Sequence, residues 1–218
     1  MGPQVKICGL TRIEEAAYLN EAAADYAGFV FYPKSKRNLS IPQAKQIMKE
    51  LSPSIKRVAV LVSPRAEEIK EIEEAGFDII QIHKELYPET YAAAQKPLWR
   101  ALNIANAKEL KEQKTGAEGS GQNSLAEEDP EKKIAAYLID GENFGSGQTF
   151  DWSAAERIRE FVGESAFILA GGLNPDNIEE AIRLFTPDIV DVSSGVEGKS
   201  GKDREKILEF VRKARKNG

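Results

Sequence analysis

Short β-branched apolar runs alternate along the chain with longer amphipathic stretches. Eight of these runs have the length and composition of strands, at residues 5–8, 26–31, 57–62, 79–83, 98–102, 136–140, 167–170 and 189–192. Each is followed by a stretch suited to a helix. The alternation predicts an α/β protein with parallel strands covered by helices, and eight similar units favour closure into a single (β/α)8 TIM barrel.

Local signals mark the beginning of several of these helices. Thr11 is placed to cap the first helix, and Ser40 with Pro42 just inside should open the second. Asn174-Pro175 precedes the seventh. These signals support the division of the chain into strand and helix pairs.

An internal echo also supports a repeated unit. Asp25, Asp78 and Asp188 each stand immediately before an apolar strand. The repeated pattern is short, so coincidence explains it as well as a shared structural role does.

One segment interrupts the regularity. Residues 113–133 are rich in Gly, Ser, Glu and Lys, and Leu125 is their one large apolar side chain. Such a segment buries too little apolar surface to order itself. We therefore expect one domain over residues 1–218 with a flexible insertion at about 113–133, on the barrel face opposite the active site. A partner-binding loop is the functional alternative.

Composition narrows the function classes. The 218 residues are 41% hydrophobic with a formal charge of −5, and both signs are interspersed over most of the chain, which argues against a nucleic-acid partner. No apolar run approaches the ~18 residues of a membrane span, and no signal-peptide pattern is seen, so no membrane partner and a cytoplasmic location are expected. One cysteine and one histidine exclude an intrachain disulfide and the usual zinc sites, so we expect no metal.

In such a barrel, catalytic groups come from the carboxyl ends of the strands. Cys8 ends the first predicted strand, and Gly9 allows a sharp turn after it. A lone strand cysteine is usually a small buried hydrophobe, but its position makes Cys8 a candidate base. Strand alternation puts Lys6 on the same face, where its ammonium would favour the thiolate. A buried ion pair between Lys6 and a carboxylate such as Asp191 is an equally good interpretation.

Asp140 ends the sixth predicted strand. Partial desolvation there would raise its pKa and suit it to donate a proton, whereas an aspartate that binds loop amides is the structural alternative. The following loop contains Gly145-Ser146-Gly147, which is typical of a mobile lid or an anion-binding nest. Asp191 shares a strand face with Ser193, and a structural ion pair is slightly favoured over a contact with a substrate hydroxyl.

Four further strand ends carry candidate binding groups. Gly171-Gly172 and Ser193-Ser194-Gly195 follow the seventh and eighth strands, where barrels commonly bind phosphate through backbone amides. Arg37 lies in the cationic loop 31–37, which is either solvated surface or a carboxylate site. His83 ends the fourth strand, and the sequence shows no obvious partner for it. A histidine at this position can hydrogen-bond to a loop as readily as it can take a catalytic role.

Five sequence blocks lie in order at these strand ends. They are KICGLT at 6–11, GFVF with KSKR at 28–37, QTFDW at 148–152, AGGLNP at 170–175 and DVSSGVE at 191–197. Together they resemble the phosphoribosylanthranilate isomerases, which are barrel enzymes of tryptophan biosynthesis. The resemblance covers nearly the whole chain.

The resemblance implies an Amadori rearrangement of N-(5-phosphoribosyl)anthranilate to 1-(2-carboxyphenylamino)-1-deoxyribulose 5-phosphate. Asp140 would be the acid that opens the ribose ring, Cys8 the base that removes the C2 proton, and Arg37 the anchor of the anthranilate carboxylate. The other residues expected at the substrate are Lys6, His83, Gly145, Ser146, Gly147, Gly171, Gly172, Asp191, Ser193, Ser194 and Gly195. The resemblance implies no metal and no cofactor. The partner is this small phosphorylated sugar, and the enzyme is a monomer or a homodimer.

Departures and rivals limit the resemblance. Lys84 stands where family members often have glycine, which puts the shape of that loop in doubt, and residues 113–133 are longer than usual. Ribulose-phosphate epimerase would need metal ligands that this chain lacks, and the related histidine-pathway isomerase would use aspartates at both catalytic strand ends. A barrel that only binds is disfavoured by intact Cys8, Asp140 and Arg37.

Overall fold

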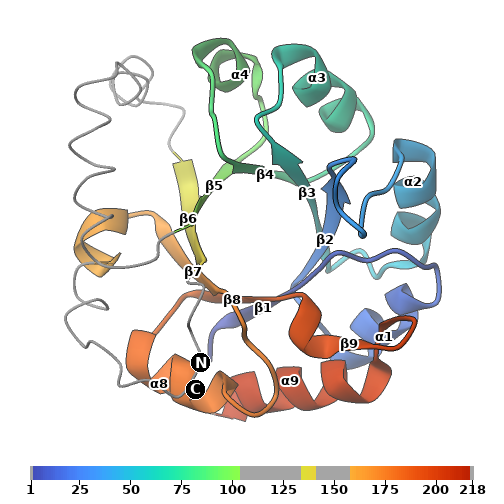
Figure 1. Ribbon diagram of the computed structural model, residues 1–218, viewed down its shortest axis with the longest axis vertical. Helices are drawn as coiled ribbons and strands as arrows, with labels where there is room; N and C mark the ends of the chain where they lie inside the picture. The colour runs from blue at the N-terminus through green and yellow to red at the C-terminus, as the bar shows by residue number, and fades with distance from the viewer. Residues whose placement is uncertain (1, 104–133, 141–157, 217–218) are drawn as a thin grey trace.

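The computed structural model describes residues 2–103, 134–140 and 158–216. Eight parallel strands form a closed barrel in sequence order, and the barrel closes where β1 pairs with β8 (Figure 1). The strands are β1 (Gln4–Cys8), β2 (Tyr26–Phe31), β3 (Lys56–Val62), β4 (Ile79–His83), β5 (Leu98–Asn103), β6 (Ile134–Asp140), β7 (Ala166–Ala170) and β8 (Ile189–Val192). All eight predicted strands are confirmed, with ends that differ by at most two residues.

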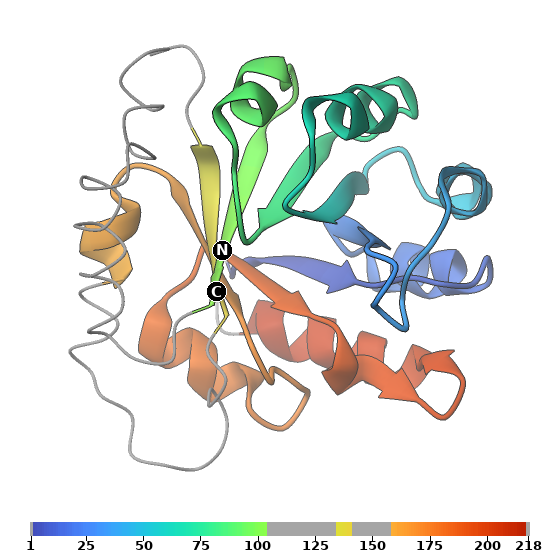
Figure 2. The same ribbon diagram turned by 45° about the horizontal axis from the view of Figure 1, so that its top comes forward.

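Helices cover the outside of the barrel (Figures 1 and 2). The helices whose full extent lies within the described residues are α1 (Glu15–Ala22), α2 (Ile41–Glu50), α3 (Ala66–Glu74), α4 (Pro88–Ala93), α8 (Ile178–Phe185) and α9 (Arg204–Lys216). Between β8 and α9 the chain forms the short helix η1 (Ser194–Val196) and a hairpin of β9 (Glu197–Gly198) and β10 (Gly201–Lys202). The predicted insertion at 113–133 lies outside the described residues.

The helix starts follow the sequence signals in two of three cases. Ser40 directly precedes α2, and its amide donates to Gln43 Oε1 at 2.9 Å. Asn174-Pro175 stands in the turn before α8. The prediction that Thr11 caps α1 is wrong, because α1 begins at Glu15 and the Thr11 amide donates to the Glu15 carboxylate at 2.7 Å.

The repeated aspartate has a structural role. Asp25, Asp78 and Asp188 each precede a strand, and each carboxylate accepts the amide of a neighbouring strand. The distances are 2.7 Å to Val5 N, 2.8 Å to Arg57 N and 2.8 Å to Phe167 N. These carboxylates satisfy amides at the amino ends of β1, β3 and β7, where the strand ladder begins. The aspartate that recurs in the sequence therefore has the same structural role at three strands.

The interior of the barrel is mostly apolar. Side chains such as Val60, Leu138 and Ile168 fill it, while a larger apolar cluster joins the outer faces of the strands to the helices. Lys6 and Asp191 are two charged residues buried inside it, with 0% and 9% of their side-chain surfaces exposed. This charged pair thus lies inside the barrel, just below the carboxyl ends of its strands.

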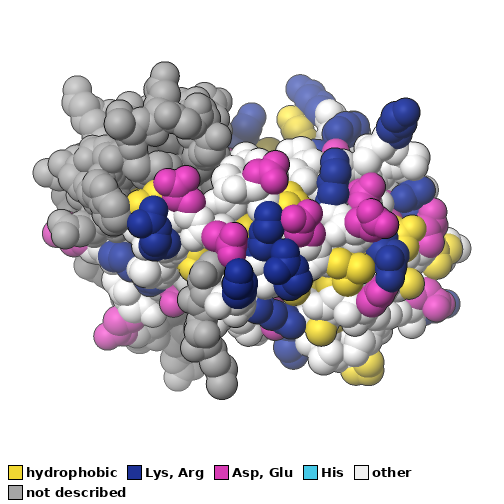
Figure 3. Space-filling view, turned by 90° about the horizontal axis from the view of Figure 1, so that it is seen from below, with side chains coloured by type: hydrophobic (Ala, Val, Ile, Leu, Met, Phe, Trp, Pro, Cys, Tyr) yellow, Lys and Arg dark blue, Asp and Glu magenta, His cyan; other side chains and the backbone are white. Residues whose placement is uncertain are grey.

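The outer surface seen in Figure 3, on the side of α8 and α9, interleaves basic and acidic side chains. The two ends of the described chain meet, since a side chain on Gly2 would lie 2.9 Å from the carbonyl oxygen of Ala214. Within the described ranges, every helix is too short or too polar to cross a membrane.

Candidate active site

The predicted site residues gather at one end of the barrel. Cys8, His83 and Asp140 are the last residues of β1, β4 and β6. Gly171 and Ser193 directly follow β7 and β8. Because the strands are parallel, all these positions lie at the same mouth of the barrel. The predicted contacts at Gly145, Ser146 and Gly147 lie outside the described residues.

Glycines leave room around the Cys8 thiol. A Cβ on Gly28, the partner of Cys8 on β2, would lie 2.8 Å from the sulfur. Gly9 has φ +79°, and a Cβ there would lie 2.3 Å from Arg37 Cδ. The side chain of Arg37 therefore packs against Gly9, in the turn that follows Cys8.

Lys6 and Asp191 form a buried ion pair one layer below Cys8. Lys6 Nζ lies 2.8 Å from Asp191 Oδ2, and the two residues are partners in the register of β1 and β8. Burial opposes the charge on Lys6, but the attraction of Asp191 and Cys8 outweighs it and raises the pKa of Lys6. Among the described residues, Asp191 Oδ1 has no hydrogen-bond partner. The predicted ion pair is confirmed, and it leaves the Oδ1 atom of Asp191 as an acceptor without a donor in this part of the structure.

Burial dominates the titration of Cys8. The residue is 8% exposed, and this desolvation raises the pKa of the thiol above its ordinary value. The ammonium groups of Lys6 and Lys202 act in the opposite direction, and Asp191 adds to the rise. The expectation that the Lys6 ammonium favours the thiolate is confirmed, but burial outweighs this effect, so the net shift in the pKa of Cys8 is upward.

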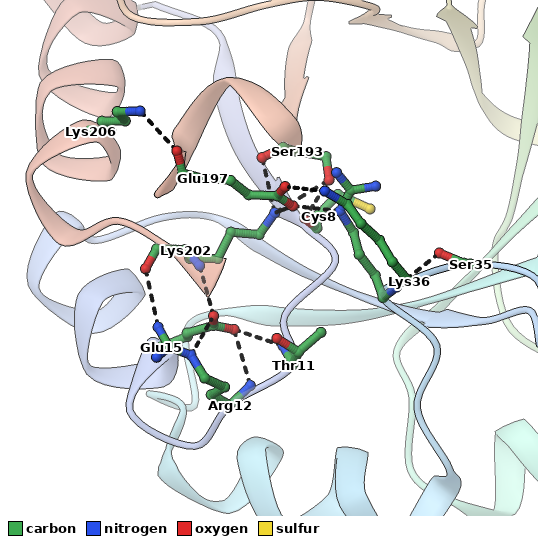
Figure 4. Close-up of polar contacts among 11 residues, drawn as sticks. Cys8, Thr11, Arg12, Glu15, Ser35, Lys36, Ser193, Glu197, Lys202 and Lys206 are labelled. Atoms are coloured by element: carbon green, nitrogen blue, oxygen red, sulfur yellow. Dashed lines mark hydrogen bonds and ion pairs between the residues drawn. The ribbon is translucent and has the colours of Figure 1, made fainter. Parts of the chain in front are cut away.

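Lys202, from the β9–β10 hairpin, is a buried cation at this mouth that the sequence patterns did not indicate. Its Nζ donates to the carbonyl oxygen of Ser193 at 3.0 Å and lies 3.1 Å from Glu197 Oε1 (Figure 4). Ser193 in turn donates its hydroxyl to the Cys8 carbonyl at 3.0 Å. Burial lowers the pKa of Lys202, although Glu197 and Cys8 oppose the shift. The hairpin thus brings a positive charge to Cys8.

The Glu197 carboxylate forms ion pairs with three cations at this mouth. Its carboxylate lies 2.5 Å from Arg37 Nε, 3.0 Å from Lys36 Nζ and 3.1 Å from Lys202 Nζ. Burial opposes its ionisation, but the bonds to Arg37, Lys36 and Lys202 lower the pKa of Glu197 to about 2. Glu197 is ionised at neutral pH.

His83 is held by a residue of its own strand. Its Nε2 lies 2.8 Å from Gln81 Nε2, so the ring nitrogen accepts and the amide donates. Burial, with smaller effects of Lys6 and Arg100, lowers the pKa of His83 to about 4. The next residue, Lys84, has φ +58°, a left-handed conformation that glycine adopts at little cost. Lys84 takes that conformation at a cost of about 1 kcal/mol.

The loops after β7 and β8 pack directly against each other. Gly171 and Gly172 have φ +95° and +63°. A Cβ on Gly195 would lie 1.9 Å from the carbonyl oxygen of Leu173, so no side chain fits at residue 195. The short helix η1 follows β8, as expected for a barrel phosphate site.

Asp140 lies on the interior face of β6. Strand alternation places it with Ala136 and Leu138, which are part of the apolar cluster inside the barrel. Its side chain is half-buried. Asp140 and Cys8 therefore face one mouth from different strands.

A closed (β/α)8 barrel that gathers a buried thiol, an inward carboxyl group and an arginine at the carboxyl ends of its strands defines a barrel enzyme equipped for acid–base chemistry. Residues 5–213 match the family model described as N-(5'phosphoribosyl)anthranilate (PRA) isomerase. The chain belongs to this isomerase family.

Individual relatives agree over full length. The N-(5'-phosphoribosyl)anthranilate isomerases of Geobacter sp. (strain M21) and Streptococcus mutans are 36% and 38% identical, with 98% of this chain and 98% and 99% of the relatives covered. The solved phosphoribosyl anthranilate isomerase of Thermotoga maritima superposes with a TM-score of 0.80 at 34% identity, over 98% of this chain and 99% of that one. Another, in complex with reduced 1-(o-carboxyphenylamino)-1-deoxyribulose 5-phosphate, has a TM-score of 0.79 at 32% identity with the same coverage.

Proposed function

We propose that the chain catalyses the Amadori rearrangement of N-(5-phosphoribosyl)anthranilate in tryptophan biosynthesis, with Asp140 as the acid and Cys8 as the base. The observation that carries the proposal is the placement of Cys8 and Asp140 at one barrel mouth, with Arg37 packed against Gly9, the residue that follows Cys8. Family membership supplies the reaction, and the site supplies groups able to perform it.

The mechanism has two proton transfers. Asp140 donates a proton to the ribose ring oxygen as the bond from that oxygen to C1 breaks, and the nitrogen lone pair forms the C1=N iminium. Cys8 acts as a base only in its thiolate form, which burial disfavours and the ammonium groups of Lys6 and Lys202 favour. The thiolate removes the C2 proton, and the released electron pair forms the C1=C2 bond and neutralises the iminium. The resulting enolamine tautomerises to the ketone. A thiolate suffices as base because the cationic iminium acidifies the C2 proton, and each transfer contributes about 10²- to 10⁴-fold.

The other groups at the mouth suit the rest of the substrate. The guanidinium of Arg37 fits the anthranilate carboxylate. The loops that carry Gly171, Gly172, Ser193, Ser194 and Gly195 suit the phosphate. The same proposal includes binding roles for Lys6, His83, Asp191, Gly145, Ser146 and Gly147. The Oδ1 atom of Asp191, which has no hydrogen-bond partner among the described residues, is suited to accept a hydrogen bond from a substrate hydroxyl.

The wider setting is also part of the proposal. We place the enzyme in the cytoplasm, because a single cysteine that acts as a base must stay reduced. The chain acts as one barrel domain and as a monomer or a homodimer; one Thermotoga maritima relative is described as dimeric.

The test is turnover of N-(5-phosphoribosyl)anthranilate, followed by the loss of its fluorescence. We expect Cys8→Ala and Asp140→Asn each to lower kcat at least ~10²-fold, the low end for removal of an acid or a base. Glu21→Ala, which removes an exposed ion pair with Arg204 on the outer helices, is the control and should keep wild-type kcat. Absence of turnover by the wild type, or near-normal rates in both variants, would contradict the proposal.

A further inference from the structure

Arg37 is already oriented in the absence of substrate. Its Nε lies 2.5 Å from Glu197 Oε1, in a pair with 23% and 14% of the side-chain surfaces exposed. In the part of the chain that the structure describes, neither terminal nitrogen of Arg37 has a partner. A guanidinium has a side edge through Nε and an end edge through the two terminal nitrogens. Glu197 occupies the first edge and leaves the second available.

Glu197 is itself fixed by a buried cation. The Lys202 ammonium, 1% exposed, lies 3.1 Å from the same Oε1 atom that faces Arg37. Lys36, by contrast, is 73% exposed, so solvent weakens its pairing with Glu197. Three cations face one carboxylate, and the cluster therefore keeps an excess of positive charge toward the mouth.

Lys202 has its own supports. Its ammonium donates to the carbonyl oxygen of Ser193 at 3.0 Å and lies 3.3 Å from the hydroxyl. Its backbone amide donates to Glu15 Oε1 at 2.8 Å, where Glu15 is completely buried. The hairpin that carries Lys202 is thus attached to both the loop after β8 and the start of α1 (Figure 4).

We propose that Glu197 is a positioning residue, anchored by Lys202, that aims the end edge of Arg37 at the aromatic carboxylate of the substrate. The inference rests on the proposed function and deepens it. Arginine binds a carboxylate best through two parallel hydrogen bonds, and this geometry requires a fixed guanidinium plane. Without Glu197, the side chain of Arg37 would lose that plane and pay more conformational entropy on binding.

The test is a double-mutant cycle on substrate recognition. Glu197→Ala should raise KM for the anthranilate substrate roughly 10-fold, with kcat changed less, as expected for loss of a charge-assisted hydrogen bond used in binding. Arg37→Ala should raise KM by more. The double variant should resemble Arg37→Ala alone, because Glu197 acts through Arg37.

A substrate without the carboxylate separates positioning from a general structural role. With N-(5-phosphoribosyl)aniline, Glu197→Ala and Arg37→Ala should both leave KM within about 2-fold of the wild-type value for that compound. Glu197→Gln keeps an acceptor for Arg37 Nε and should recover part of the lost affinity. The same substitution in the exposed pair, Glu21→Ala, serves as the matched control.

The outcomes distinguish the two proposals. Additive effects of Glu197→Ala and Arg37→Ala, or an equal loss with the aniline compound, would overturn the positioning role while the wild type still turns over. If Glu197→Ala does not fold, the inference is overturned by a Glu197→Gln variant that folds and shows equal losses with both compounds. Absence of turnover by the wild type would overturn the proposed function itself.

Discussion

The imidazole of His83 lies at the end of β4, where burial keeps it neutral. The Gln81 amide donates to its Nε2, and the pKa of about 4 lies below the ordinary value of 6.5. Above pH 6.5 the ring is neutral in both the folded and the unfolded protein. Below that value the unfolded chain gains a proton that the folded protein refuses until the pH approaches 4.

This difference predicts an acid-dependent loss of stability. As the pH falls from 6.5 to 4, His83 should reduce the free energy of unfolding by up to about 3 kcal/mol. His83→Gln, whose amide oxygen can accept from Gln81, should lack this contribution. Urea unfolding of both proteins across this pH range measures it. Parallel pH dependences of the two proteins would contradict the buried neutral imidazole.

The Cys8 thiol shows what a sequence pattern can and cannot give at this scale. Its strand-end position and its neighbour Lys6 follow from alternation and are confirmed. The direction of its pKa does not follow, because it depends on how completely the barrel excludes water and on Lys202, which comes from a distant hairpin. Burial is a property of the whole fold, so local sequence cannot weigh it against a charge.

At the scale of elements, the Glu15 carboxylate joins three segments. It accepts the amides of Thr11 at 2.7 Å and Arg12 at 3.1 Å in the loop after β1, and that of Lys202 at 2.8 Å in β10. Glu15 itself opens α1. One buried acidic side chain therefore holds the first active-site loop, the first helix and the hairpin together.

Removal of this carboxylate should loosen all three segments. We expect Glu15→Ala to lower the free energy of unfolding by about 3 kcal/mol, since it leaves backbone amides without their charged acceptor, and Glu15→Gln to lower it less. Chemical denaturation measures both changes. Glu21→Ala, in the same helix but in an exposed pair, should change stability by less than about 1 kcal/mol. Equal effects of Glu15→Ala and Glu21→Ala would show that the buried carboxylate has no special role.

The eight strands were predictable, whereas the hairpin was not. A barrel strand is a run of β-branched apolar residues, and this signal is local. The strands β9 and β10 have two residues each, which is too short to show any periodicity. Lys202 meets Glu15 across 187 residues of sequence, so their bond depends on barrel closure. Thr11 is not the cap because α1 begins four residues later, at Glu15, and a cap acts through its side-chain oxygen from the residue just before the helix.

At the scale of the whole molecule, the proposed catalytic groups and the segment at 113–133 are attached to opposite ends of the barrel. Cys8 and Asp140 stand at the carboxyl ends of β1 and β6, whereas the amino end of β6 begins at Ile134. Residues 113–133 precede Ile134 directly in the sequence. The attachment of this segment to β6 is therefore at the end of the barrel opposite the proposed chemistry.

This topology predicts that the segment can be shortened without loss of catalysis. Replacement of residues 114–130 by a short Gly-Ser linker should leave kcat/KM within about 3-fold of wild type, since positions remote from the chemistry contribute little to transition-state binding. Stability should change by under about 1 kcal/mol, because loop-closure entropy varies slowly with length. A Gly-Ser replacement of equal length is the matched control for composition.

Both variants should unfold in one cooperative transition, as a single domain does. A large loss of kcat/KM in both would place the segment in the site, and two transitions would contradict one domain over residues 1–218.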